Sequence, residues 1–186
     1  AYPTRTLFIQ NQTLETGLDE SVNEVFERLS EVPLFAPLND EETMRLARAC
    51  EAKIFSPNEP IVRKGQEGGS MFVIHRGSVK VQILENGFPK TINTLTEGDF
   101  FGEMVLFTGE PRTANVVAAE ETEVLEIKQP ALKPLFDANP ELVEALSKTI
   151  AERRAALFKK DDESAATPEE ESKGIFNSIK SFFGLN

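Results

Sequence analysis

Short runs of alternating hydrophobic and polar residues occupy the middle of the chain. Val79, Val81 and Ile83 alternate with polar residues, which is the period of a strand with one buried face. The pair Asn86-Gly87 follows them and predicts a tight hairpin turn, because both residues tolerate the positive φ angles that such a turn needs. Further strands are expected at residues 52–55, 61–63, 71–76, 91–95, 115–119 and 123–128. Many short strands at this spacing predict a jelly-roll barrel.

Segments with helical periodicity flank this β-rich block. Residues 19–29 and 140–158 carry apolar side chains every three or four positions, which is typical of helices with one buried face. Asn39 and Glu42 have the spacing of a capping box at the start of another helix. Pro130 opens a short helix, and Asn139-Pro140 supplies a cap and a first-turn proline for the last one. The predicted fold is mainly β, a jelly-roll barrel with N-terminal helices and C-terminal lid helices.

The two ends of the chain differ from this block. We expect residues 1–18 to form a strand and linker, and residues 19–160 to form the main domain. Residues 161–173 include a stretch with six acidic side chains and are expected to be a solvated linker. Residues 174–186 place Ile175, Ile179 and Phe182 on one helical face, with Phe176 and Phe183 beside them. This amphipathic helix docks on its parent domain, on an oligomer neighbour or on a membrane surface.

Composition excludes several classes of function. The net charge of −11 repels DNA and other polyanions, and no apolar run reaches the roughly 20 residues that span a bilayer. Cys50 is the only cysteine, which fits a reducing cytoplasm, and its helical spacing with Met44 indicates a core thiol. His75 is the only histidine, so metal binding and histidine-based catalysis have little support. We therefore expect a non-enzymatic protein that works without a metal or a cofactor.

Candidate chemistry concentrates between Phe101 and Ala114. Gly102 and Glu103 stand at the start of a short helical turn, and Arg112 follows a loop. Free amides at a helix start attract an anion, and an arginine can donate two parallel hydrogen bonds to a phosphate. The Glu103 carboxylate is an acceptor for a sugar hydroxyl. This set suits a small ligand with both groups, although a simple Glu103–Arg112 salt bridge beside a turn is the alternative.

The stretch Phe101-Gly102-Glu103-Met104-Val105-Leu106, followed by Arg112-Thr113-Ala114, resembles the phosphate-binding cassette of the cyclic-nucleotide-binding domain family. The resemblance extends over roughly residues 24–160. It implies that Gly102 and Glu103 hold the ribose of a cyclic nucleotide. The remaining ligand-binding positions that it implies, from the cassette, the barrel and the final helix, are Met104, Val105, Arg112, Thr113, Ala114, Val81, Leu95, Arg153 and Leu157.

Within that set the resemblance assigns separate tasks. The amide of Val105, with Arg112 and Thr113, is expected to hold the phosphate. Val81 and Leu95 line the base pocket, with plain core packing as the alternative, while Arg153 and Leu157 approach the base from the final helix. Val105 departs from the family, which usually has a small residue there, so its side chain is expected to crowd the sugar or to shift the affinity. The expected ligand is cAMP, with cGMP second, since a hydroxyl at Thr113 can also accept from guanine.

The N-terminal segment suggests a parent protein. Residues 2–9 form an alternating strand without a clear place in the barrel. They resemble the last strand of the cytoplasmic domain of small-conductance mechanosensitive channels, a family that includes cyclic-nucleotide-gated bacterial members. The resemblance implies a cytoplasmic piece of a homo-oligomeric channel at the membrane face, whose partner is its own channel domain. A disordered leader is the alternative for these residues.

The expected function is a cyclic-nucleotide sensor whose C-terminal helix closes over the ligand and so regulates an ion channel. A stand-alone cytoplasmic adaptor or regulatory subunit acting on a partner protein is the second interpretation. A transcription regulator needs a helix-turn-helix with a basic face, whereas the chain becomes acidic after residue 160. A phosphodiesterase needs a metal cluster that activates water, and the sequence offers none.

Overall fold

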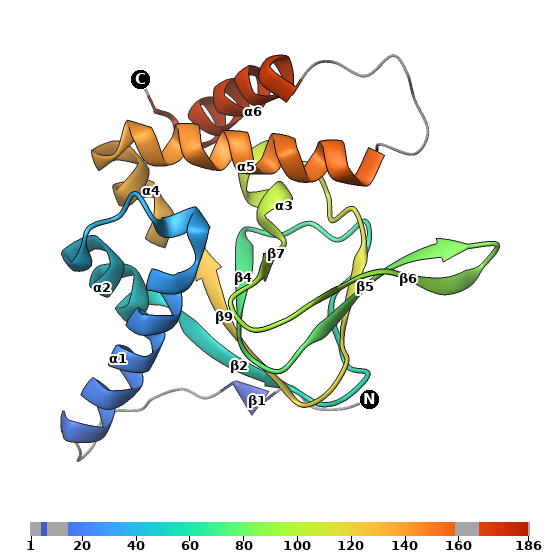
Figure 1. Ribbon diagram of the computed structural model, residues 1–186, viewed down its shortest axis with the longest axis horizontal. Helices are drawn as coiled ribbons and strands as arrows, with labels where there is room; N and C mark the ends of the chain where they lie inside the picture. The colour runs from blue at the N-terminus through green and yellow to red at the C-terminus, as the bar shows by residue number, and fades with distance from the viewer. Residues whose placement is uncertain (1–4, 7–14, 159–167, 186) are drawn as a thin grey trace.

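The computed structural model describes residues 5–6, 15–158 and 168–185, and these form two antiparallel sheets with helices packed around one end (Figure 1). The strands are β1 Arg5–Thr6, β2 Glu51–Phe55, β3 Pro60–Val62, β4 Ser70–Arg76, β5 Val79–Glu85, β6 Phe88–Leu95, β7 Phe100–Phe101, β8 Asn115–Ala118 and β9 Thr122–Lys128. The helices are α1 Glu15–Glu31, the 3-10 helix η1 Pro33–Phe35, α2 Asp40–Ala49, α3 Glu103–Thr108, α4 Gln129–Ala138, α5 Pro140–Phe158 and α6 Pro168–Phe183.

The strands close into the expected jelly roll. One sheet has the order β1-β2-β9-β4-β7, the other has the order β3-β8-β5-β6, and every pairing is antiparallel. The hairpin between β5 and β6 turns at Asn86 and Gly87, whose φ angles are 53° and 82°. These positive values confirm the predicted tight turn. The prediction of a mainly β fold with flanking helices is confirmed as well.

The N-terminal strand has a place in the barrel that the sequence did not suggest. Residues 5 and 6 pair antiparallel with Ile54 and Lys53 of β2, at the edge of the five-stranded sheet. Such an edge accepts any extended segment through main-chain hydrogen bonds. The pairing of this segment with β2 therefore cannot be predicted from a side-chain pattern. The rest of the predicted strand at residues 2–9 lies outside the described residues.

Polar caps fix the helices before and after the barrel. Asn39 accepts a hydrogen bond from the backbone of Glu42, whose carboxylate accepts from the Asn39 backbone, so the predicted capping box is confirmed. The side-chain amide of Asn139, just before α5, donates to the same Glu42 carboxylate. One glutamate therefore ties α2 to the start of α5. As predicted, α5 begins at Pro140.

Two groups of buried side chains stabilise the domain. The smaller lies between the two sheets and includes Phe55, Phe72 and Val124. The larger joins the five-stranded sheet to the helices, and Cys50 packs against it. Burial raises the pKa of the Cys50 thiol to about 12, so the thiol stays protonated and unreactive at neutral pH. This environment agrees with the core thiol predicted from sequence.

Helix α6 packs on the domain and begins earlier than predicted. It starts at Pro168, within the segment expected to be a linker, because a first-turn proline and the glutamates that follow it suit a helix N-terminus. Ile175, Ile179 and Phe183 are buried. The side chain of Phe182, which the sequence placed on the same face, lies outside the described residues. In Figure 1, α6 lies along α5, and it also contacts α3.

An aromatic cluster joins three of these helices. The ring of Phe183 on α6 lies 4.8 Å from that of Phe136 on α4 and 6.3 Å from that of Phe107 on α3, measured between centroids. Phe107 and Phe136 are themselves 5.9 Å apart. Such edge-on and tilted pairs stabilise beyond the apolar area that they bury. The cluster therefore connects the C-terminal helix to the short helix that follows Gly102.

Within the described ranges, no helix has the length and apolar character that crossing a bilayer requires.

The aromatic cluster leads to a prediction about stability. Phe183→Ala removes a ring that is 3% exposed, and such truncations cost about 3–5 kcal/mol of unfolding free energy. Urea denaturation followed by circular dichroism measures this loss. Ser181→Ala, at an exposed position of the same helix, is the control and should unfold at the wild-type urea concentration. Equal midpoints for wild type and Phe183→Ala would show that α6 does not pack on the domain.

Candidate functional site

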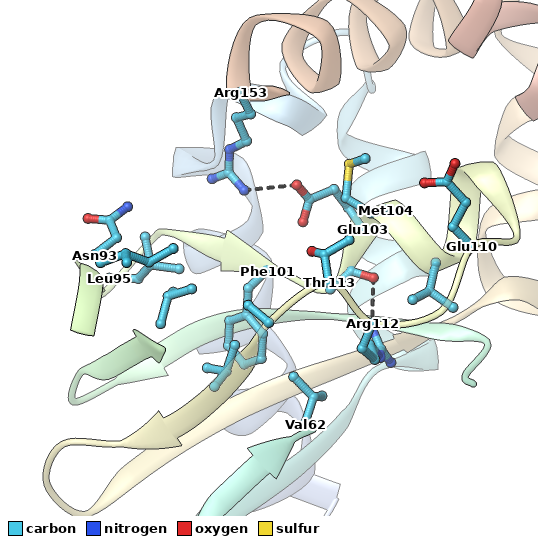
Figure 2. A pocket seen from close by; sticks show the side chains of 16 residues that line it. Val62, Asn93, Leu95, Phe101, Glu103, Met104, Glu110, Arg112, Thr113 and Arg153 are labelled. Carbon is cyan, nitrogen blue, oxygen red and sulfur yellow. Dashed lines mark hydrogen bonds and ion pairs between the residues drawn. The ribbon is translucent and has the colours of Figure 1, made fainter. Parts of the chain in front are cut away.

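A cavity of about 690 Å³ lies at the end of the barrel nearest α5 (Figure 2). Its walls come from the four-stranded sheet, from the end of β7 and the glycine turn after it, from α3 with the loop that follows it, and from one residue of α5. A volume of this size suits a small organic molecule. The lining residues are Val62, Val81, Ile92, Asn93, Leu95, Phe101, Gly102, Glu103, Met104, Val105, Glu110, Arg112, Thr113, Ala114, Val116 and Arg153.

A glycine turn brings α3 to the wall of the cavity. Gly102 has a φ of 79° and lies between the end of β7 and the start of the helix at Glu103. Side chains rarely tolerate this left-handed conformation, and glycine adopts it without strain. The first amides of α3 have no acceptor within the helix, as at any helix start. Val105 is 4% exposed and lines the cavity, so its two methyl groups occupy room that a smaller residue would leave open.

Arg112 is buried beneath α3 and bonds to neutral oxygens. Its guanidinium donates to the carbonyl oxygen of Gly102 at 2.7 Å and to that of Ser70 at 2.9 Å. It also lies 5.6 Å from the ring centroid of Phe72. Burial lowers the pKa of Arg112, and the carboxylates of Glu126 and Glu103 oppose that shift. The group remains a cation, because arginine keeps its proton in proteins.

Glycine at two positions makes room for this guanidinium. A Cβ atom added to Gly68 would lie 2.7 Å from Arg112 Nη2, and one added to Gly102 would lie 2.5 Å from Nη1. Either contact is shorter than real side chains allow, so the guanidinium would have to move. At Gly69, next in the chain, an added Cβ would have nothing within 4 Å. The position of Arg112 thus depends on Gly68 and Gly102.

Glu103 faces α5, where its partner is Arg153 (Figure 2). Arg153 Nη1 lies 3.1 Å from Glu103 Oε1, and the Glu103 side chain is 6% exposed. Arg153 also donates to the carbonyl oxygen of Phe100 at 2.9 Å and lies 3.7 Å from the centroid of that ring. The alternative of a Glu103–Arg112 salt bridge is therefore not what the structure contains. Arg153 reaches the cavity as expected, but its contacts are with the acid and the ring below it.

The structure brings most of the predicted site residues together. Ten of the predicted positions line the cavity: Val81, Leu95, Gly102, Glu103, Met104, Val105, Arg112, Thr113, Ala114 and Arg153. The side chain of Leu157 lies outside the described residues. These ten positions therefore include the buried cation Arg112, the buried carboxylate Glu103 and several apolar side chains.

Sequence reasoning missed several lining residues. Val62, Ile92, Asn93, Phe101, Glu110 and Val116 also contact the cavity. Ile92 is the extra residue of a β-bulge, since Gln82 pairs with Thr91 and Val81 pairs with Asn93. A bulge re-aims the side chains around it, so strict alternation along this strand does not show which of them face the cavity. Ile92, an apolar residue between the polar Thr91 and Asn93, was the available signal.

His75, the only histidine of the chain, does not line the cavity. His75 is 7% exposed, and its Nε2 lies 3.9 Å from Glu24 on α1. Burial lowers its pKa, so the ring is neutral at pH 7. The described part of the chain contains no group of three or more His, Cys, Asp or Glu side chains arranged to hold a metal ion.

Comparison with known proteins identifies similar domains. Residues 52–139 match the model of the cyclic nucleotide-binding domain family. A cyclic nucleotide-gated potassium channel of Rhizobium etli is 35% identical over 146 residues, which cover 76% of this chain and 40% of the channel. A cGMP-dependent protein kinase of Caenorhabditis briggsae is 34% identical over 135 residues, covering 71% of this chain and 18% of the kinase. The chain thus spans less than half the length of these curated relatives.

Solved structures show the same fold. The regulatory domain of Toxoplasma gondii PKA, crystallised with cAMP, superimposes with a TM-score of 0.67 and 24% sequence identity. The match covers 75% of this chain and 53% of that one. At this level of identity the likeness concerns the arrangement of strands and helices. It supports the jelly-roll assignment made from the strand pairing.

The glycines around Arg112 generate a prediction with a matched control. Gly68→Ala should displace the guanidinium and weaken cyclic-nucleotide binding at least about tenfold, or roughly 1.4 kcal/mol. Because the clash is with the end of a flexible side chain, the unfolding midpoint should change little. Gly69→Ala, which meets open space, should bind like wild type. Isothermal titration calorimetry measures the affinity of each variant. Equal affinities for the two variants would contradict the role of Gly68.

Proposed function

The chain contains a domain of the cyclic nucleotide-binding family, and from this premise we propose that it senses cAMP and passes the binding event to its C-terminal helices. The observation that carries this proposal is the placement of Arg112 and Glu103 in one cavity. A cyclic nucleotide presents an anionic phosphate and a ribose hydroxyl side by side. A buried guanidinium and a nearby carboxylate are the groups that bind these two.

The phosphate binds at the Arg112 end of the cavity. Arg112 turns donors toward two phosphate oxygens, the Val105 amide donates at the start of α3, and the Thr113 hydroxyl completes the set. Support comes from the burial of Arg112, whose exposed fraction is 7%. An ion pair shielded from water is stronger than one at the surface. The ring of Phe72 beneath the guanidinium limits its movement.

The ribose binds at Gly102 and Glu103, and the base lies along the apolar strands. The 2′-OH donates to the Glu103 carboxylate. Val81 and Leu95 cover one face of the base, and Arg153 on α5 stands at the far side of the cavity (Figure 2). The Thr113 hydroxyl also admits cGMP, which is the second ligand choice.

Ligand binding is transmitted to the rest of the protein by a change in the position of α5. The ion pair between Glu103 and Arg153 links the ribose site to this helix. A ligand on Glu103 therefore biases the position of α5 by its different affinity for the two positions, typically about 1–3 kcal/mol. The aromatic cluster of Phe107, Phe136 and Phe183 couples α3 to α4 and α6. The lid movement thus involves the helical layer as a whole.

The regulated module is a membrane ion channel, with this domain on the cytoplasmic side. Support comes from the potassium channel of Rhizobium etli, of which the chain covers 40%. The second candidate is a regulatory subunit or adaptor acting on a partner protein, and the similarity to a cGMP-dependent protein kinase favours it. Nucleotide-dependent conductance of the full-length protein in planar bilayers supports the first. Its absence, with nucleotide binding intact, supports the second.

The direct test of ligand binding is calorimetric titration with cAMP and cGMP. We expect saturable binding of cAMP, with weaker binding of cGMP. Arg112→Lys keeps the charge but loses the planar fork, so it should weaken cAMP binding at least about tenfold, or roughly 1.4 kcal/mol. Arg63→Lys on the barrel surface is the control and should leave the affinity unchanged. No heat of binding from wild type at millimolar nucleotide would refute the proposal.

The role of Glu103 has its own test. Wild type should bind 2′-deoxy-cAMP about tenfold more weakly than cAMP, because the carboxylate loses its hydroxyl partner. Glu103→Ala, which has no side-chain acceptor, should bind both ligands with nearly equal affinity. Competition against a fluorescent cyclic nucleotide gives all four constants. If the variant still discriminates between the two ligands as wild type does, Glu103 does not hold the 2′-OH.

A further inference from the structure

A chain of contacts runs from Arg112 into the wall of the barrel. Arg112 Nη2 donates to the carbonyl oxygen of Ser70 at 2.9 Å. The hydroxyl of the same serine donates to Glu126 Oε1 at 2.7 Å. The other oxygen of that carboxylate makes an ion pair with Lys53. Two cations and one anion are thereby connected through one serine.

Strand register places these charges inside the barrel. On β9, Glu126 stands two residues from Val124 and directly opposite Phe72 of β4, and both of these belong to the apolar cluster between the sheets. Lys53 stands opposite Val124 from the other side, on β2. Side chains two apart on a strand share a face. Ser70, Glu126 and Arg112 are accordingly 6%, 8% and 7% exposed.

Buried charges are costly unless each has a partner. Burial raises the pKa of Glu126, but the hydrogen bonds from Lys53 and Ser70 outweigh it and leave that pKa below its usual value. Glu126 is therefore an anion at neutral pH. It is also the carboxylate that acts most strongly on Arg112. The Glu126 carboxylate therefore competes with a ligand phosphate for interaction with the Arg112 guanidinium, unless another cation pairs with Glu126.

Lys53 is that cation. With Lys53 present, the three side chains carry a net charge of +1, since two cations offset one anion. Without it, the charges of Glu126 and Arg112 cancel, and the phosphate meets a neutral site. Lys128 does not replace it, because its amine lies 2.8 Å from Glu51 and its side chain is 51% exposed.

We propose that Lys53 and Glu126 are positioning residues for the phosphate site: Glu126 holds Ser70 beneath Arg112, and Lys53 engages Glu126 so that the charge of Arg112 remains available to an anionic ligand. This inference rests on the proposed function, because the ligand is the cyclic nucleotide. It adds two residues that lie outside the cavity lining. It also assigns them opposite electrostatic effects, which a purely structural role would not produce.

The experiment compares four variants of the full chain by calorimetric titration with cAMP. Lys53→Met leaves Glu126 free to act on Arg112 and should weaken binding about tenfold. Lys53→Met combined with Glu126→Gln removes the competing anion while keeping an acceptor for the Ser70 hydroxyl, and should bind within about threefold of wild type. Glu126→Gln alone should bind at least as tightly as wild type. Lys128→Met, which breaks an exposed ion pair between the same two strands, is the control and should match wild type.

Each outcome has a consequence. Rescue of Lys53→Met by Glu126→Gln supports the inference, since a packing defect at Lys53 would persist in the double variant. Wild-type affinity in Lys53→Met, or no rescue in the double variant, overturns it. If Lys53→Met does not fold, Glu126→Gln decides, because weaker binding in that variant contradicts the proposed competition. Failure of wild type itself to bind cAMP would overturn the proposed function, and this inference with it.

Discussion

The site depends on a buried guanidinium whose hydrogen-bond partners are neutral. Arg112 donates to the carbonyl oxygens of Gly102 and Ser70, which orient the group without cancelling its charge. Those carbonyls belong to the turn before α3 and to the first residue of β4, so correct closure of the barrel fixes the cation. The arrangement is sterically demanding, because Gly68 and Gly102 leave no room for a side chain beside the guanidinium.

Both carboxylates that act on Arg112 are paired with other cations. Glu103 bonds to Arg153 of α5, and Glu126 bonds to Lys53 of β2. A chain with a net charge of −11 can in this way keep a local positive site, because electrostatics at short range depend on which charges are neighbours. The two ion pairs differ in what they connect. One joins the cavity to a helix, and the other joins it to the barrel wall.

The parts of the fold that sequence could predict are those that local geometry determines. Asn86-Gly87 and the pair Asn39 with Glu42 act over two to four residues, so their turn and cap follow from their identity. The ligand-binding role of Arg112 was predicted from the resemblance of its motif and spacing to a known family. The pairing of Lys53 with Glu126 depends on how β2 and β9 align across 70 residues of chain, and a shift of one residue would turn either side chain away.

Helix α3 is where the cavity and the helical layer meet. Met104 and Val105 line the cavity, while Phe107 on the same helix packs against Phe136 and Phe183. A helix of six residues is too short to bend between these contacts, so a displacement at one face reaches the other. Packed aromatic rings resist gradual deformation. A ligand that shifts α3 must therefore either move α4 and α6 with it or break the cluster.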